Sequence, residues 1–128
     1  MIEVHTSVPG LLDPSGPFSQ VTVATGTIVS LAGQVALDER GNVVGEGDAG
    51  AQAAQCLHNL DVALRHVGAS PSDVVKVTIF VTDVGDRAAI AEARRAYFGT
   101  HTPAATMVGV AALAIPGCVV EIEATAVI

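Results

Sequence analysis

The chain has 128 residues, of which 50% are hydrophobic, and a formal net charge of −7. That length fits one domain, residues 1–128, with a substantial core. The six Lys and Arg residues are too few and too scattered for the basic footprint of a nucleic-acid-binding protein. No apolar run approaches the roughly 20 residues that span a bilayer, and the N-terminus lacks a secretion-signal pattern. We therefore expect a cytoplasmic protein without nucleic-acid or membrane partners.

The N-terminal part of the chain reads as short strands and turns. Ile2–His5 predicts a short edge strand, and the Pro- and Gly-rich arm that ends at Gly16–Phe18 predicts a loop. Val21–Thr25 and Thr27–Ala36 are two β-rich runs separated by Gly26, which is the pattern of a hairpin. A polar, Gly-rich connection follows.

Helical and β-rich patterns alternate in the rest of the chain. Apolar residues in a 3-4-3-4 rhythm predict an amphipathic helix over Ala49–Val67, with Asp48 as its N-cap. A second helix is predicted over Arg87–Phe98, capped by one of the aspartates before it. The β-branched run Val74–Thr82 predicts a central strand, and Ala104–Ala111 predicts a strand of small residues.

The last ten residues, Val119–Ile128, alternate with a period of two and predict the closing strand. Its odd side carries Glu121 and Glu123 on a run that is otherwise apolar. Either both carboxylates face water, or at least one of them lines a cavity; Glu123 is the better candidate for a structural role. The element order predicts an α+β fold in which two helices pack on one face of a mixed β-sheet.

Two helices on one face leave the other face of such a sheet uncovered. The mean hydropathy of +0.53 is high for a soluble protein of this size, so excess apolar surface is expected to be buried between subunits. We therefore expect a ring-like homo-oligomer with ligand clefts between its subunits.

Six segments, taken together and in order, resemble a known family. They are GPFSQ (Gly16–Gln20), AGQVALDERGNVV (Ala32–Val44), AAQCLHNLDVAL (Ala53–Leu64), VVKVTIFVTD (Val74–Asp83), TPAATMVGV (Thr102–Val110) and VEIEATAV (Val120–Val127). Over essentially the whole chain, the sequence resembles the Rid (RidA/YjgF) superfamily, also called the L-PSP endoribonuclease family. The resemblance implies a chorismate-mutase-like fold and a homotrimer with the uncovered sheet face inward. It also implies small-molecule pockets at the subunit interfaces, and we expect no cofactor.

The resemblance also implies a reaction and a set of pocket residues. Archetypal members hydrolyse reactive imine and enamine intermediates formed from amino acids, which releases a 2-keto acid and ammonia. The Glu that orients the attacking water falls on Glu121, and the pocket aromatic, usually Tyr, falls on Phe18. The family's third-strand Ser falls on Ala32. The Arg that clamps the substrate carboxylate falls on Ala105, and the residue two further on, often Cys, is Met107.

Only the carboxylate of this set is kept, so we expect an altered substrate range. A methyl group cannot replace a bidentate guanidinium–carboxylate pair. A pocket built from Phe18, Ala105 and Met107 is expected to prefer an apolar, uncharged part of a substrate. Backbone groups of Thr106, Met107 and Cys118 are expected to polarise the substrate in place of the missing Arg.

Two classes of function remain open. The first is a hydrolase or deaminase in which Glu121 activates water. The second is a non-catalytic trimeric binding protein whose clefts hold a small apolar metabolite. Glu121 favours the enzyme, whereas Ala32 and Ala105 favour the binding protein. Core packing remains the alternative role for Phe18 and Met107.

The histidines and cysteines do not predict a metal site or a disulfide framework. His58 and His66 are two helical turns apart on the first helix, which is not the spacing of a ligand pair. Cys56 is expected to be buried packing in that helix. Cys118 follows a Pro-Gly turn at the rim of the expected pocket.

Overall fold

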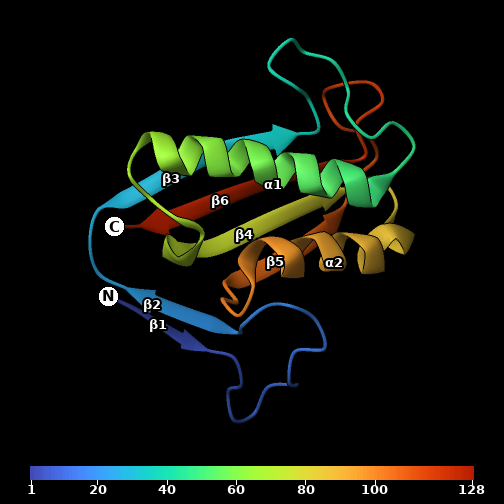
Figure 1. Cartoon of the computed structure of the whole chain (residues 1–128). Helices are drawn as coiled ribbons and strands as arrows, with labels where there is room; N and C mark the ends of the chain where they lie inside the picture. Colours follow the sequence, from blue (N-terminus) through green and yellow to red (C-terminus); the bar gives the residue numbers. More distant parts are fainter.

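The computed structural model describes all 128 residues and contains a four-stranded sheet, a separate two-stranded sheet and two α-helices (Figure 1). The elements are β1 (Ile2–His5), β2 (Val21–Ala24), β3 (Ile28–Val35), α1 (Ala49–His66), β4 (Val74–Val81), α2 (Arg87–Phe98), β5 (Ala104–Gly109) and β6 (Val120–Val127), with short 3₁₀ turns at Pro71–Asp73 and Val84–Asp86. The predicted α+β architecture is confirmed, and the expected helices and strands begin and end within two residues of these bounds.

The strand order of the larger sheet is β3-β6-β4-β5. β6 runs antiparallel to both of its neighbours, whereas β4 and β5 are parallel. Parallel neighbours need a crossover, and α2 supplies it between β4 and β5. The closing strand therefore lies inside the sheet, with backbone ladders on both sides.

The predicted hairpin between Val21–Thr25 and Thr27–Ala36 is wrong. β2 pairs with β1, while β3 pairs with β6. Gly26 has φ +143°, and a Cβ at this position would lie 2.5 Å from the backbone oxygen of Ile128. The N–H of Thr27 donates to that same oxygen. The contact with the end of β6 fixes the position of the chain at Gly26. The chain therefore passes at this residue from the two-stranded sheet to the four-stranded sheet.

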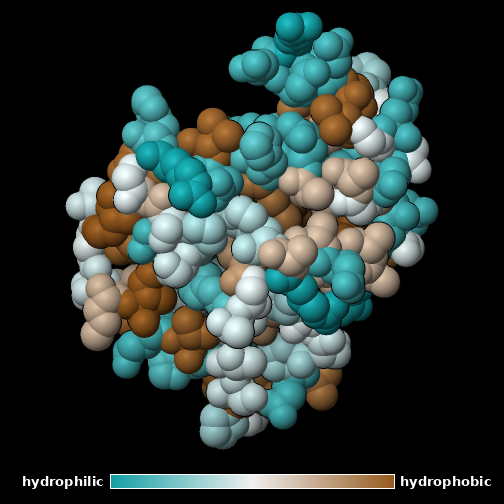
Figure 2. Space-filling model, viewed as in Figure 1, coloured by the Kyte–Doolittle hydropathy of each residue, from teal (hydrophilic) through white to brown (hydrophobic).

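Both helices cover the same face of the four-stranded sheet (Figure 1). The even positions of β6 point into this layer, and their exposed fractions do not exceed 6%. The largest fully buried side chains from the helices and strands are Leu57, Leu60, Leu64, Ile79, Ile90 and Ile122. Seen from the helix side, the surface is a mosaic of polar and apolar residues (Figure 2). No helix is long and apolar enough to cross a membrane.

A polar contact caps the start of α1, and other polar contacts join the two helices. Asp48 is the predicted N-cap of α1, and its Oδ1 accepts from the N–H of Ala51 at 3.0 Å. Between the helices, the Tyr97 hydroxyl donates to Asp61 at 2.8 Å. Arg65 donates to the other oxygen of Asp61 at 2.6 Å. Burial by itself raises the pKa of Asp61, but the hydrogen bonds from Arg65 and Tyr97 and the charge of Arg65 together outweigh it, so the pKa lies below its ordinary value.

The two sides of β6 differ in what a side chain contributes to stability. Ile122 is fully buried, and its neighbour Glu123 is exposed on the uncovered face. Ile122→Ala removes buried methyl groups and leaves a cavity, so it is expected to lower the free energy of unfolding by about 2–5 kcal/mol. Glu123→Ala is expected to change it by no more than about 0.5 kcal/mol. Urea unfolding of both variants measures the difference, and equal losses would contradict this assignment of the two faces.

Candidate functional site

Glu121 lies on the uncovered face of the sheet, half-buried between neighbouring strands. The register places it beside Val35 of β3 and Phe80 of β4. Its carboxylate lies over Gly33, where an added Cβ would be 3.0 Å from both Cδ and Oε1 of Glu121. No side-chain hydrogen bond or ion pair of the chain uses this carboxylate. The Glu121 carboxylate is therefore an acceptor without a partner in the chain. It occupies space that stays open because Gly33 has no side chain.

Other polar groups share this face with Glu121. Glu123 stands beside Thr78, one pleat along β6, and is exposed. Lys76 of β4 donates to the hydroxyl of Thr106 on β5 at 2.9 Å. The predicted site residue Thr106 therefore presents its side chain to the uncovered face.

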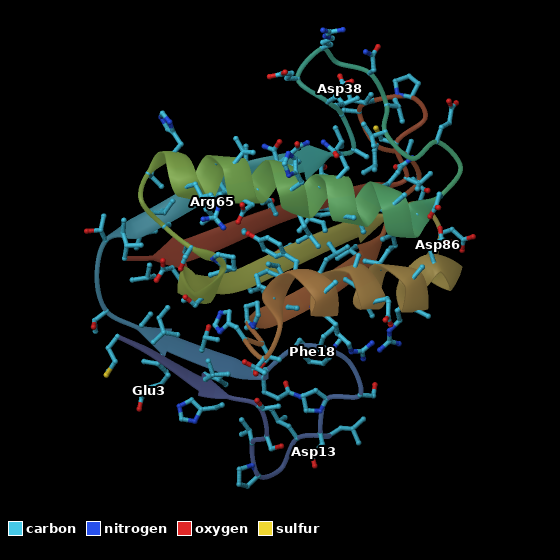
Figure 3. All side chains as sticks on the ribbon, in the orientation of Figure 1. Glu3, Asp13, Phe18, Asp38, Arg65 and Asp86 are labelled. Carbon is cyan, nitrogen blue, oxygen red and sulfur yellow. The ribbon has the colours of Figure 1, made fainter.

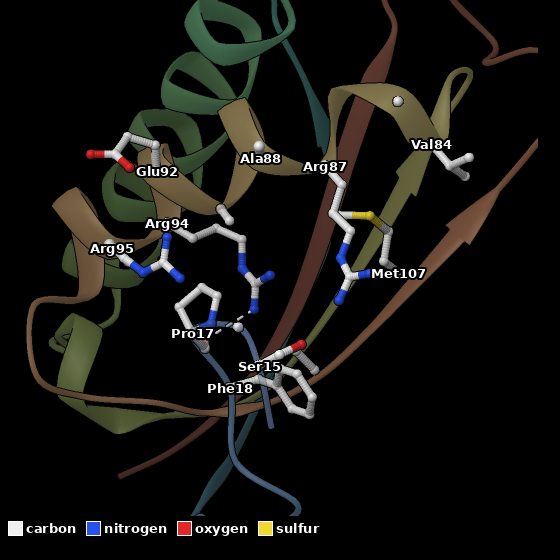
Figure 4. Close-up of a pocket in the computed structure, with 14 residues that line it drawn as sticks. Ser15, Pro17, Phe18, Val84, Arg87, Ala88, Glu92, Arg94, Arg95 and Met107 are labelled. Atoms are coloured by element: carbon white, nitrogen blue, oxygen red, sulfur yellow. Dashed lines mark hydrogen bonds between the residues drawn. The ribbon is translucent and has the colours of Figure 1, made fainter. Parts of the chain in front are cut away.

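Three other predicted site residues gather in a pocket on the helix side of the sheet. Phe18, Ala105 and Met107 line a cavity of about 870 Å³ between the N-terminal arm, α2 and β5 (Figure 4). Phe18 comes from the arm, which lies against α2 (Figure 3), and the backbone of Ser19 donates to Pro103 just before β5. The volume is in the range of small-molecule sites.

The pocket and Glu121 lie on opposite faces of one sheet. Met107 stands beside Ile79, which is fully buried under the helices. Glu121 stands beside Phe80, the next residue along β4. Because successive side chains of a strand point to opposite faces, a single protomer does not bring Glu121 to the pocket.

The other two predicted residues do not line the pocket. Ala32 is exposed beside Gly33, where β3 bulges against β6. Cys118 is 5% exposed. The loop around it is tied to α1, because the Gln52 side chain donates to the Gly117 carbonyl at 2.9 Å and accepts from the Val119 N–H at 2.8 Å.

The pocket is not the apolar, uncharged cavity that the sequence suggested. Arg87, Arg94 and Arg95 line it, which is half of the six Lys and Arg residues of this acidic chain. Arg87 and Arg94 are seven residues apart on α2, so they share one helix face. The prediction of this helix from the sequence used only its apolar residues. The spacing of Arg87 and Arg94 is the signal in the sequence that would have indicated a charged helix face.

Arg94 is the unusual member of the three. It is 5% exposed, and one of its terminal nitrogens donates to the Pro17 carbonyl at 3.2 Å. Its Nε is buried without a partner. Burial lowers the pKa of Arg94 to about 10, with a smaller effect of Arg95 in the same direction. The guanidinium therefore keeps its charge at neutral pH, in a site where an uncompensated charge is costly.

The cysteines and histidines do not line this pocket. Cys56 is fully buried, as predicted, and its Sγ lies 3.5 Å from the Val120 carbonyl. Burial raises the pKa of the Cys56 thiol to about 12, so it is not a thiolate nucleophile at neutral pH. His101 contacts the Val74 carbonyl through Nε2 at 2.7 Å. No three His, Cys, Asp or Glu side chains come together as a metal site.

This chain is similar to a known family and to characterised proteins over most of its length. Residues 10–128 match the family model described as Endoribonuclease L-PSP. A 2-iminobutanoate/2-iminopropanoate deaminase of Dermatophagoides farinae is 38% identical over 122 residues, 95% of this chain and 94% of the relative. A RutC family protein of Pyrococcus horikoshii is 36% identical over 113 residues, 88% of each chain.

Solved structures agree with these sequence matches. The crystal structure of a protein of unknown function of the conserved Rid protein family from Yersinia pestis superimposes with a TM-score of 0.89 at 38% identity. The match covers 99% of this chain and 98% of that one.

Proposed function

This chain belongs to the endoribonuclease L-PSP family, the Rid superfamily, and we propose that it hydrolyses reactive imines or enamines with water activated by Glu121. The name of the Dermatophagoides farinae relative supports the reaction class. One observation carries the residue assignment: the Glu121 carboxylate is unpaired and lies over Gly33 on the uncovered face. An unpaired carboxylate in a half-buried site is a suitable proton acceptor for water.

The proposed chemistry balances with water as the only co-reactant. Glu121 takes a proton from water as the water oxygen bonds to the imine carbon, and it passes this same proton to the imine nitrogen. The product is a carbinolamine, with hydroxyl and amine on one carbon. Glu121, ionised again, then takes the hydroxyl proton and delivers it to the amine nitrogen, and the C–N bond breaks as the carbonyl forms. A carbonyl compound and ammonia are released.

The proposal includes a homotrimer, because the two parts of the site face apart in one protomer. Packing the β5 edge and pocket of one copy against the uncovered β3–β6 face of the next would bring Phe18 and Met107 to Glu121. Such head-to-tail contacts close into a ring. They would also cover apolar groups such as Ile28, which is 71% exposed. Ala32 and Thr106, both exposed on that face, would then lie at the substrate cleft.

The second candidate is a trimeric binding protein without turnover. Ala105 in the pocket, in place of the Arg implied by the family resemblance, is the observation in its favour. Substrate turnover separates the two candidates, because both predict ligand binding.

Glu121→Gln removes the proton acceptor and keeps the side-chain volume. Ammonia release from imino acids generated in the assay, and from neutral imines, is expected to fall about 100-fold in kcat. Gly33→Ala is expected to lower kcat as well, because its methyl group meets the Glu121 carboxylate. Glu123→Gln is the matched control on the same strand and should act like the parent chain. An unchanged kcat in Glu121→Gln would contradict the role of Glu121 as proton acceptor. Ligand binding by the parent chain without ammonia release would favour the second candidate, the binding protein.

The assembly is tested separately from the chemistry. Sedimentation equilibrium is expected to give three times the chain mass of 12.9 kDa, because the uncovered face and the β5 edge bury each other around a ring. A monomer at micromolar concentration would contradict the proposed trimer.

A further inference from the structure

The helix side of the pocket presents positive charge to its interior. Figure 4 shows the side chains of Arg94 and Arg87 running from α2 toward the arm that carries Ser15, Pro17 and Phe18. The chain as a whole carries −7, so this grouping runs against its general composition.

No carboxylate of the chain neutralises Arg94. The only salt bridge joins Arg65 and Asp61 on α1. Glu92 is the one acidic residue that lines the pocket, and it is exposed and makes no ion pair with Arg94. A guanidinium has five N–H donors, and one of those on Arg94 is used, in the bond to Pro17.

We propose that Arg94, with Arg87 beside it, is an anion-binding subsite that receives the carboxylate of a small organic acid. The buried, unpartnered Nε of Arg94 and the free terminal N–H groups present a planar fork, which matches a carboxylate in a bidentate pair. This subsite supplies from α2 the positive charge that is missing at Ala105. The proposal of this subsite rests on the proposed function in one respect only: the bound acid is taken to be the molecule that reacts in this pocket.

The opposite wall of the pocket defines the rest of the ligand. Phe18, Ala105 and Met107 are apolar, and the unbranched thioether of Met107 adapts to ligands of different shape. A carboxylate at Arg94 would place a short aliphatic chain against these three side chains. The ligand class is therefore a short-chain carboxylic acid, such as a 2-oxo or 2-imino acid.

Binding of a reaction product analogue tests this subsite without turnover. The probes are 2-oxobutanoate, its neutral counterpart 2-oxobutanamide, and inorganic phosphate, each titrated calorimetrically against the full chain. The variants are Arg94→Met, which keeps the length of the side chain without its charge, and Arg94→Lys, which keeps the charge without the fork. Arg40→Met is the matched control: Arg40 is exposed, and its backbone N–H donates to Asp38, which Figure 3 shows at the opposite end of the molecule from Phe18.

The parent chain is expected to bind 2-oxobutanoate about ten-fold or more tightly than 2-oxobutanamide, since only the acid forms a charge-assisted pair. Arg94→Met should abolish this preference, Arg94→Lys should keep part of it, and Arg40→Met should keep all of it. If Arg94→Met does not fold, the acid-to-amide ratio in the parent chain and in Arg94→Lys decides.

Three results would overturn the subsite. Equal binding of acid and amide would show that the charge is not used. Tighter binding of phosphate than of 2-oxobutanoate would assign the arginines to a different anion. Loss of the oligomer in Arg94→Met, with an unchanged acid-to-amide ratio, would show that a carboxylate of a second copy pairs with Arg94. Selective binding of the acid without ammonia release would support the subsite and would contradict only the proposed hydrolysis.

Discussion

The alternation of side chains along β6 is the constraint on which the rest of the structure depends. Because β6 lies inside the sheet, its even residues are the centre of the core and its odd residues stand on a face without helices. Ile122 and Glu121 are adjacent in the chain, and one is essential packing while the other is an unpaired carboxylate. A shift of one residue in this register would exchange them, so the same pairing that builds the core also positions the candidate proton acceptor.

The same pleat divides the candidate site. It directs Met107 toward the helices and Glu121 away from them, so one protomer does not bring these two candidate site residues together. The uncovered face carries the candidate proton acceptor, and the helix side holds the cavity that we propose for the substrate. Association of copies would join these halves, so in this account assembly and activity have one structural cause.

The charge around the pocket is opposite in sign to the net charge of the chain. An acidic chain with few cations repels anionic ligands at long range, yet three arginines surround the pocket. Burial of Arg94 makes its interaction with a bound anion stronger than it would be at the surface. The chain lacks an arginine on β5, and α2 presents one to the same cavity.

Much of the fold could be predicted from local patterns, but pairing and orientation could not. Asp48 as a cap and the two faces of β6 follow from propensity and period, which are local properties. The hairpin at Gly26 failed because the partner of β3 lies about a hundred residues away in sequence. Glu121 and Met107 were identified by resemblance, whereas their opposite directions required the register. Arg94 was missed because a charged helix residue is seldom buried without a partner.

Mixed oligomers test the central claim, that one site uses two copies of the chain, most directly. Glu121→Gln removes the proton acceptor, and Ala105→Trp fills the pocket. Each variant alone is expected to keep no more than about 1% of the parent activity in ammonia release. Co-expressed and purified as mixed trimers, they should regain roughly one third of the parent activity, because one interface in each ring then joins an intact Glu121 to an intact pocket. Mixed trimers as inactive as the two separate variants would contradict a site shared between subunits.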